Sequence, residues 1–518
     1  MFKTYFDSLH VFELSAALSL LFISIICFNK KKYKVSIILL LFSGIVLRYF
    51  MITLDPFLNV WDEQLHVLVA KNMMHHPFKP MFYSDPVLPF DFRNYIGNSV
   101  WVHKQPLFLW QMALSMKIFG VNEIAARVPG LIMSALMILL IYRTGTLSMN
   151  RSIGYIGAML FAFGNFSLEL VSGWCHTDHN DSAFLFYVSA SIWAFTEYYF
   201  NPRKRWIIFT GILTGCAVLV KWLPALIVFF IWFIAILCNK DKRKLVKSYY
   251  DFAIAFIISV IIFMPWTIYT HLAFPQEAAY ESHFNTLHFI TCLEGHYGNF
   301  FYHINKIDEL YFPLAKFLFI PALFLFYRNM KMKSLALAIT SGVVFIYLFF
   351  SIAKTKMPAF TTMVNMPVYL AFAALIYGLW HAVKFRNRIP NTLYILLISV
   401  ILFIIAVFEL NIERIQYIHT NWRPKQADYR KSKLADRKVY NAISKKYKNK
   451  GFVIFNVKHY EHPSCMFYTS LTAYDYLPDD TTITHLIKEG RTPVIIQRDS
   501  LPPYILENKH IEIVNGNE

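Results

Sequence analysis

The chain has 518 residues, of which 56% are hydrophobic and 16% are charged, and its formal net charge is +18. Soluble domains carry about 25% charged residues, so this composition excludes an ordinary multidomain soluble protein. It also excludes a disordered chain and a secreted scaffold held by disulfides. The basic residues form short clusters between apolar runs, which is typical of cytoplasmic loops and argues against nucleic acid as a partner.

The apolar runs predict a polytopic α-helical membrane protein with about twelve transmembrane helices. A helix needs about 20 apolar residues to cross a bilayer. Such runs lie at 11–28, 35–54, 128–147, 152–171, 182–199, 206–220, 222–238, 251–270, 313–327, 335–352, 364–383 and 391–410. The basic clusters fall in alternate loops, which the positive-inside rule places in the cytoplasm. Both termini and segments 55–127, 172–181 and 271–312 are therefore predicted on the outer face.

The first outer segment is rich in aromatic residues, and we expect amphipathic helices that lie in the membrane interface. Its run from Pro106 to Gly120 is apolar but short for a span, so it is assigned to the interface as well. After residue 410 the composition becomes that of a soluble chain. Helical stretches alternate there with four β-rich runs, which predicts a small α/β domain at 411–518 beside a transmembrane catalytic domain at 1–410.

Acidic residues beside the membrane core indicate a functional site. Asp62 and Glu63 follow the second predicted span, and Asp178 and Asp181 lie in a short outer loop that contains no Lys or Arg. Such carboxylates could accept a hydroxyl proton. The alternative role in both places is a helix N-cap, because Asp caps helices well.

Four basic residues are predicted at the same outer face, where positive charge is depleted: Lys104, Arg127, Lys354 and Lys356. A lipid phosphate that arrives along the interface would need such donors. The alternative is snorkelling of a long side chain from a helix end. Acids that take a proton and bases that hold a phosphate together predict transfer from a lipid phosphate to a hydroxylated acceptor.

These same residues carry a family resemblance. Trp61-Asp-Glu63, His103-Lys-Gln-Pro-Leu107, Ala126-Arg-Val-Pro129 and the run from Phe349 to Pro358 occur in this order. The pattern resembles bacterial GT-C glycosyltransferases of the protein mannosyltransferase and lipid A aminoarabinose transferase superfamily. The last motif looks most like the aminoarabinose-transferase branch.

The resemblance implies an inverting transferase that takes a sugar from a polyprenyl phosphate at the periplasmic side of a bacterial inner membrane. Asp62 matches the general base of the family, and Lys104 matches its phosphate-binding lysine. Asp181 or Asp178 matches the second acid, and Glu63 would support the loop. Arg127 or Lys356 would assist Lys104 at the phosphate.

The resemblance also raises the question of a metal. Some members hold a divalent ion between an acid and a later His; here the acid position is occupied by His103, and the His corresponds to His296. Two imidazoles could bind Zn²⁺, and Mg²⁺ or Mn²⁺ are alternatives, but hydrogen-bonding histidines would serve as well. No other cofactor is expected.

The acceptor stays open at this stage. Lipid A or another envelope glycolipid is the first expectation because of the Ser351 to Pro358 match, and a Ser or Thr of an exported protein is the second. The rivals from other classes are a lipid-linked sugar flippase, a secondary transporter and a non-catalytic assembly factor. A transporter would favour internal repeats and midplane charges, which the sequence does not show. A monomer would suffice.

Overall fold

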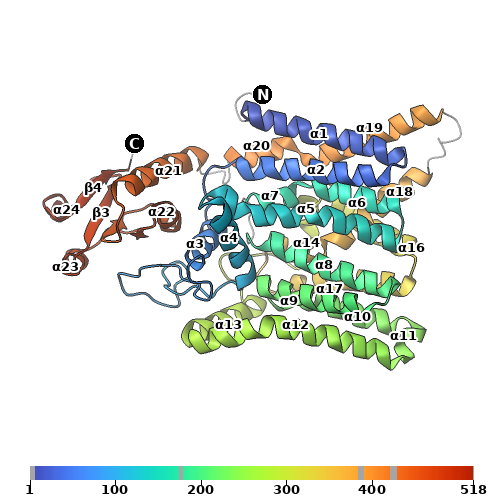
Figure 1. Ribbon diagram of the computed structural model, residues 1–518, viewed down its shortest axis with the longest axis horizontal. Helices are drawn as coiled ribbons and strands as arrows, with labels where there is room; N and C mark the ends of the chain where they lie inside the picture. Colours follow the sequence, from blue (N-terminus) through green and yellow to red (C-terminus); the bar gives the residue numbers. More distant parts are fainter. Residues whose placement is uncertain (1–5, 174–178, 383–389, 421–428, 517–518) are drawn as a thin grey trace.

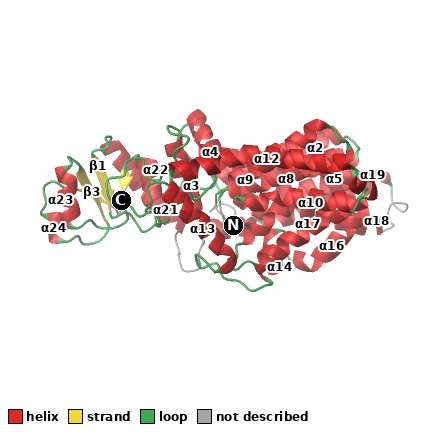
Figure 2. Cartoon of the chain, turned by 90° about the horizontal axis from the view of Figure 1, so that it is seen from below, coloured by secondary structure: helices red, strands yellow, loops and turns green. Residues whose placement is uncertain are grey.

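The structure is a computed structural model that describes residues 6–173, 179–382, 390–420 and 429–516. Long helices form one body, and a small domain that contains a sheet lies at one end of it (Figures 1 and 2). The chain therefore has two parts, an apolar helical bundle and a smaller α/β unit.

Every apolar run expected from the sequence falls on a helix. The helices of the bundle are α1 (Ser8–Asn29), α2 (Tyr33–Thr53), α5 (Glu123–Ser148), α6 (Arg151–Phe163), α7 (Asn165–Val171), α8 (Asp181–Phe200), α9 (Lys204–Lys221), η2 (Leu223–Leu226), α10 (Ile227–Leu237), α12 (Val246–Ala273), α16 (Ala315–Asn329), α17 (Lys333–Ile352), η3 (Pro358–Val364), α18 (Asn365–Ala382) and α19 (Asn391–Leu410).

The chain is a membrane protein, but the count of twelve spans is not confirmed. In the described ranges, seven helices are long and apolar enough to cross a bilayer, and α6 with α7, bent by 54°, would make an eighth. The remaining runs fall short for visible reasons. Helix α9 carries Lys204, Arg205 and Lys221 within its 18 residues, and α16 has only 15 residues.

The segments expected at the outer face contain further helices, α3 (Asp62–Met73), α4 (Pro106–Phe119), α13 (Pro275–Ile290), α14 (Tyr302–Asn305) and α15 (Ile307–Leu310). Helix α4 has 14 residues. At 1.5 Å per residue that is about 21 Å, less than the ~30 Å hydrocarbon core, as its assignment to the interface requires. Figure 1 shows α3 and α4 at the end of the bundle that faces the α/β unit. The basic helix α11 (Lys240–Lys244) lies at the opposite end.

The four expected β-rich runs become the strands of one parallel sheet, β1 (Phe452–Phe455), β2 (Thr472–Ala473), β3 (Thr492–Gln497) and β4 (Glu512–Asn515). The strand order is β2-β1-β3-β4, with Val453 beside Thr472 and Val494 beside Glu512. Helices α21 (Tyr429–Lys446), α22 (His462–Thr469), α23 (Asp480–Lys488) and α24 (Pro503–Leu506) surround it. The expected α/β fold is confirmed.

Hydrogen bonds and ion pairs join the α/β unit to the outer segments of the bundle. Arg437 lies 3.1 Å from the Glu123 carboxylate at the start of α5, and Arg491 lies 2.7 Å from the Asp85 carboxylate. Helix α20 (Ile412–Thr420) belongs with the bundle, because Arg414 pairs with Glu169 of α7 at 2.7 Å. The α/β fold itself thus begins at α21.

Candidate active site

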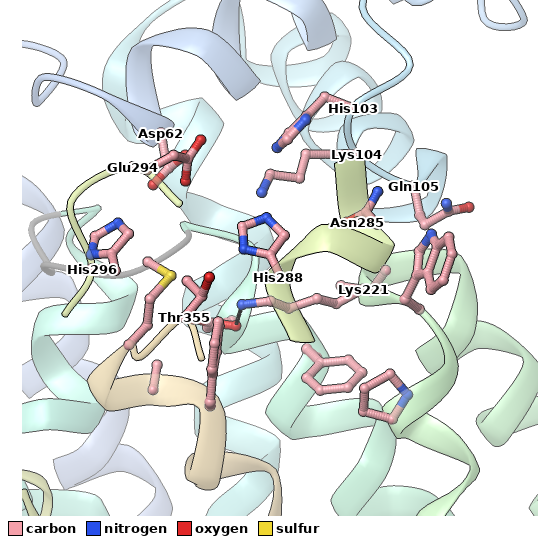
Figure 3. A pocket seen from close by; sticks show the side chains of 18 of the residues that line it. Asp62, His103, Lys104, Gln105, Lys221, Asn285, His288, Glu294, His296 and Thr355 are labelled. Atoms are coloured by element: carbon pink, nitrogen blue, oxygen red, sulfur yellow. Dashed lines mark hydrogen bonds and ion pairs between the residues drawn. The ribbon is translucent and has the colours of Figure 1, made fainter. Parts of the chain in front are cut away.

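A cavity of about 570 Å³ opens at the end of the bundle beside the α/β unit, and Figure 3 shows the side chains that line it. It lies where the start of α3, the loop before α4, the start of α8, the end of α9 and α13 converge. Its ionisable lining residues are Asp62, Glu63, His103, Lys104, Asp181, Lys221, His288, Glu294 and His296. Asp62, Asp181 and Lys104, which the sequence places at one face, therefore meet in one cavity.

Asp62 is the first residue of α3, not its cap. The preceding Trp61 has φ 67° and turns the chain sharply into the helix. The first turn of a helix favours a negative charge, because unsatisfied N–H groups point toward it. The Tyr95 hydroxyl lies 3.4 Å from Oδ1 of Asp62. The carboxylate is therefore held at the cavity wall with its charge stabilised.

Glu63 has a different environment from its neighbour. Its carboxylate accepts two hydrogen bonds from Arg127, at 2.6 Å from Nε and 3.0 Å from Nη2. Both side chains are 0% exposed. Its Oε2 also accepts from the backbone N–H of Asn59 at 2.6 Å. Glu63 thus ties the loop before Asp62 to Arg127.

Arg127 does not line the cavity. Its other three N–H groups donate to the backbone carbonyls of Ile52, Asp55 and Phe57 at 2.7–2.9 Å. An arginine has five N–H donors, so none is left for a phosphate. The structure therefore corrects the expected role: Arg127 holds the end of α2 and the loop before Asp62, and it does so because these carbonyls would otherwise be buried without partners.

The lysines of the last motif are also placed differently from expectation. Lys356 is 3% exposed, and its Nζ donates to the carbonyls of Phe350 and Ser351 at 2.8 and 2.6 Å. It caps the end of α17. Lys354 is exposed, and neither lysine lines the cavity. Thr355 between them does line it.

Lys104 and Lys221 are the lysines of the cavity wall. Lys104 follows His103 in the loop before α4. Lys221 ends α9 and forms an ion pair with Asp181, the first residue of α8. The N-cap position of α8 is taken by Asn180, so Asp181 does not cap that helix. Asp178, the alternative candidate for the second acid, lies outside the described residues.

Sequence reasoning assigned no role to several residues that line or border the cavity. Helix α13 brings Asn285 and His288 to the wall. The carboxylate of its Glu281 is hydrogen-bonded to Nδ1 of His103 at 2.8 Å. These three residues stand at helical spacing, which places them on one face. That periodicity within segment 271–312 is the signal that could have identified them. Lys221 carried no such signal, because a lysine at a helix end is common.

The two candidate metal ligands face each other across the cavity. Figure 3 shows His103 and His296 on opposite sides, with Lys104 and His288 between them. Among the residues that the structure describes, no group of three or more His, Cys, Asp or Glu side chains is arranged to hold a metal ion. His103 contacts Glu281 through Nδ1, an arrangement that is also common at metal-ligating histidines, so the metal site stays a prediction.

Comparison with known proteins agrees with the geometry. Residues 103–269, which supply His103, Lys104, Asp181 and Lys221, match the family model for dolichyl-phosphate-mannose-protein mannosyltransferases. The crystal structure of ArnT from Cupriavidus metallidurans in the apo state aligns with 91% of this chain and 94% of its own, at 15% identity and a TM-score of 0.64. The chain therefore shares the fold of this ArnT, and its residues 103–269 are similar to the mannosyltransferase family.

Other similar proteins align with this chain less completely. ArnT bound to undecaprenyl phosphate aligns with 88% of this chain and 89% of its own, at 14% identity and a TM-score of 0.60. AglB, an oligosaccharyltransferase from Archaeoglobus fulgidus in complex with an inhibitory peptide and a dolichol-phosphate, aligns over 86% of this chain but 65% of its own, at 12% identity and a TM-score of 0.56. An uncharacterized protein of Aquifex aeolicus (strain VF5) is 26% identical over 61% of this chain, which spans 58% of that relative. These structural likenesses show that the chain shares its fold with ArnT and AglB.

Proposed function

We propose that this protein transfers a sugar from a polyprenyl phosphate to an acceptor at the periplasmic side of a bacterial inner membrane. The observation that carries the proposal is that Asp62 and Lys104 line one cavity at the end of an apolar helical bundle. A carboxylate can accept a proton there, and an ammonium group can hold a phosphate. The lipid tail of such a donor would remain among the apolar helices.

The reaction is a single displacement with inversion. Asp62 removes the proton of the acceptor hydroxyl as that oxygen forms its bond to the anomeric carbon, and the bond from this carbon to the phosphate oxygen breaks. The electron pair leaves with the lipid phosphate, whose growing charge is stabilised by Lys104. Lys221, held by Asp181, is the second cation, in place of Arg127 and Lys356. An acceptor that is already ionised, such as a lipid A phosphate, would leave Asp62 to position the sugar.

The donor class is supported by two solved relatives. ArnT has been solved with undecaprenyl phosphate, and AglB has been solved with a dolichol-phosphate. Both molecules join a polyprenyl chain to a phosphate. The acceptor proposed first is lipid A or another envelope glycolipid, and a Ser or Thr of an exported protein is the alternative. A flippase or transporter of the same lipid would not need a proton acceptor at Asp62.

Mass spectrometry of lipid A and of exported proteins, from cells with and without the gene, tests this proposal. In cells that carry the gene, lipid A or an exported protein should bear an added sugar. The same fraction from cells without the gene should lack that sugar. Asp62→Asn should abolish that modification, whereas Asp91→Asn, at an exposed acid of the same outer segment, should retain it. If neither fraction gains a sugar when the gene is present, the proposal is refuted. If Asp62→Asn cells carry as much of the modification as the wild type, Asp62 is not the general base.

The phosphate site is tested separately by binding of undecaprenyl phosphate to the purified protein. Lys104→Met and Lys221→Met should each weaken binding by about tenfold, which corresponds to 1.4 kcal/mol for a charged hydrogen bond. Lys117→Met, at an exposed lysine near the end of α4, is the matched control.

We propose that transfer needs no metal. Dialysis against EDTA should therefore leave turnover unchanged. Loss of turnover with recovery on adding Zn²⁺ would contradict this.

A further inference from the structure

Backbone hydrogen bonds hold the loop that carries Asp62 into the cavity, and their partners come from both bodies of the protein. Within the bundle, the carbonyl of Phe57 accepts from Arg127, and the N–H of Asn59 donates to Glu63. Leu58 is fully buried, so its N–H needs a partner as well. The bundle does not supply it.

The α/β unit supplies the missing partners. The N–H of Leu58 donates to the hydroxyl of Tyr468 on α22 at 3.2 Å. The N–H of Val60 donates to the hydroxyl of Tyr429, the first residue of α21, also at 3.2 Å. These two contacts join positions that are 410 and 369 residues apart in the chain. They lie four and two residues before Asp62.

Each of the two hydroxyls is itself oriented by a second contact. Tyr468 donates to the Glu123 carboxylate at 2.7 Å, and Tyr429 lies 3.5 Å from the side-chain oxygen of Asn59. Burial raises the pKa of both phenols well above the usual value, so both stay protonated. A protonated phenol that donates in one direction offers its lone pairs in the other, which is where the loop N–H groups lie.

The residues on either side of Asp62 are held by the same unit. The ring of Trp61 lies 4.8 Å from the ring of Tyr460, measured between centroids. The side-chain amide of Gln64 donates to the carbonyl of Tyr460 at 2.6 Å and accepts from the hydroxyl of Ser464 at 2.6 Å. The turn at Trp61, with φ 67°, is a strained conformation for a residue that has a side chain, so it needs such support.

We propose that Tyr429 and Tyr468 are positioning residues for Asp62, through which the α/β unit fixes the catalytic loop. The inference rests on the proposed function for the role of Asp62. Loss of either hydroxyl leaves a loop N–H without its acceptor. The loop then relaxes toward another partner and carries Asp62 away from the place where the acceptor hydroxyl must lie. Small displacements of this kind reduce the chemical step more than substrate binding.

Hydrogen exchange on the full-length protein tests the contacts themselves. Tyr429→Phe and Tyr468→Phe remove one oxygen each and keep the ring. We expect amide exchange in the segment around Leu58 and Val60 to become about fivefold faster, as the loss of one hydrogen bond of ~1 kcal/mol predicts. Tyr440→Phe is the matched control, because its buried hydroxyl on α21 has no hydrogen-bond partner within the described residues. Unchanged exchange in both variants would overturn the inference.

Turnover separates a positioning role from a merely structural one. We expect kcat to fall about tenfold in each variant while KM for the polyprenyl donor stays within about twofold, because donor contacts are intact. Tyr440→Phe should match the wild type in both. A raised KM with unchanged kcat would contradict the inference. If the wild type transfers no sugar, the proposed function fails, and the exchange experiment still decides whether the tyrosines hold the loop.

Discussion

The buried ion pair between Arg127 and Glu63 gives a direct test of how the site is held. Both side chains are 0% exposed and share two hydrogen bonds of 2.6 and 3.0 Å. Removal of one partner from a buried pair costs about 3–5 kcal/mol, since the other charge stays in a low-dielectric interior. Arg127→Met also leaves the carbonyls of Ile52, Asp55 and Phe57 without their donor. We therefore expect a loss at the upper end of that range, about 5 kcal/mol.

Denaturant unfolding in mild detergent, followed by circular dichroism, measures this loss. The double variant Arg127→Met/Glu63→Met should be less destabilised than the sum of the two single variants, because it removes both charges together. Arg127→Lys should recover only part of the stability, since a lysine offers three donors in place of five. A single Arg127→Met variant that unfolds like the wild type but binds undecaprenyl phosphate weakly would refute the structural role and restore the phosphate role.

Two further predictions concern the surroundings of the site. Gly173 has φ 72°, and a Cβ there would overlap the Glu63 carboxylate, so Gly173→Ala should lower the unfolding temperature by several degrees more than Gly490→Ala, where φ is 73° and nothing lies within 4 Å; equal shifts would contradict the packing argument. Burial alone would raise the pKa of Asp475, but its contacts with His462, the Tyr460 backbone and His459 together outweigh burial and hold that pKa well below the usual 3.8. The carboxylate is then more acidic in the folded than in the unfolded chain, so it stabilises the fold above pH 3.8, and this contribution is lost as the pH falls toward the folded pKa. Lowering the pH from 6 to 3 should therefore reduce the unfolding temperature of the wild type more steeply than that of Asp475→Asn. Parallel curves of unfolding temperature against pH would refute the linkage.

Most of the fold could be predicted because hydropathy is a local property. Each apolar run and each β-rich run is visible in the sequence and is found as a helix or a strand. The number of spans was not predictable in this way, since it depends on how helices break. Helices α6 and α7 meet at Gly164 with a bend of 54°, which an apolar run from 152 to 171 does not reveal.

The site was predictable in part, for a related reason. Asp62 and Lys104 stand out because charges at an outer membrane face are rare. The sequence shows such a charge but not its partners. Arg127 donates to carbonyls about 70 residues away in the chain. Lys356 donates to a carbonyl at the end of α17, the helix that precedes it. From the sequence alone, both therefore looked like hydrogen-bond donors to a phosphate.

The loop before Asp62 lies at the junction between the helical bundle and the α/β unit, which are stabilised by different forces. The bundle is stabilised by lipid and by apolar packing, which withstand salt and moderate heat. The junction with the α/β unit also includes ion pairs that are partly open to water, such as Arg491 with Asp85. High salt would thus weaken these contacts before it weakens the bundle. A detergent preparation can retain all of its helical signal and yet have lost part of what holds the loop before Asp62.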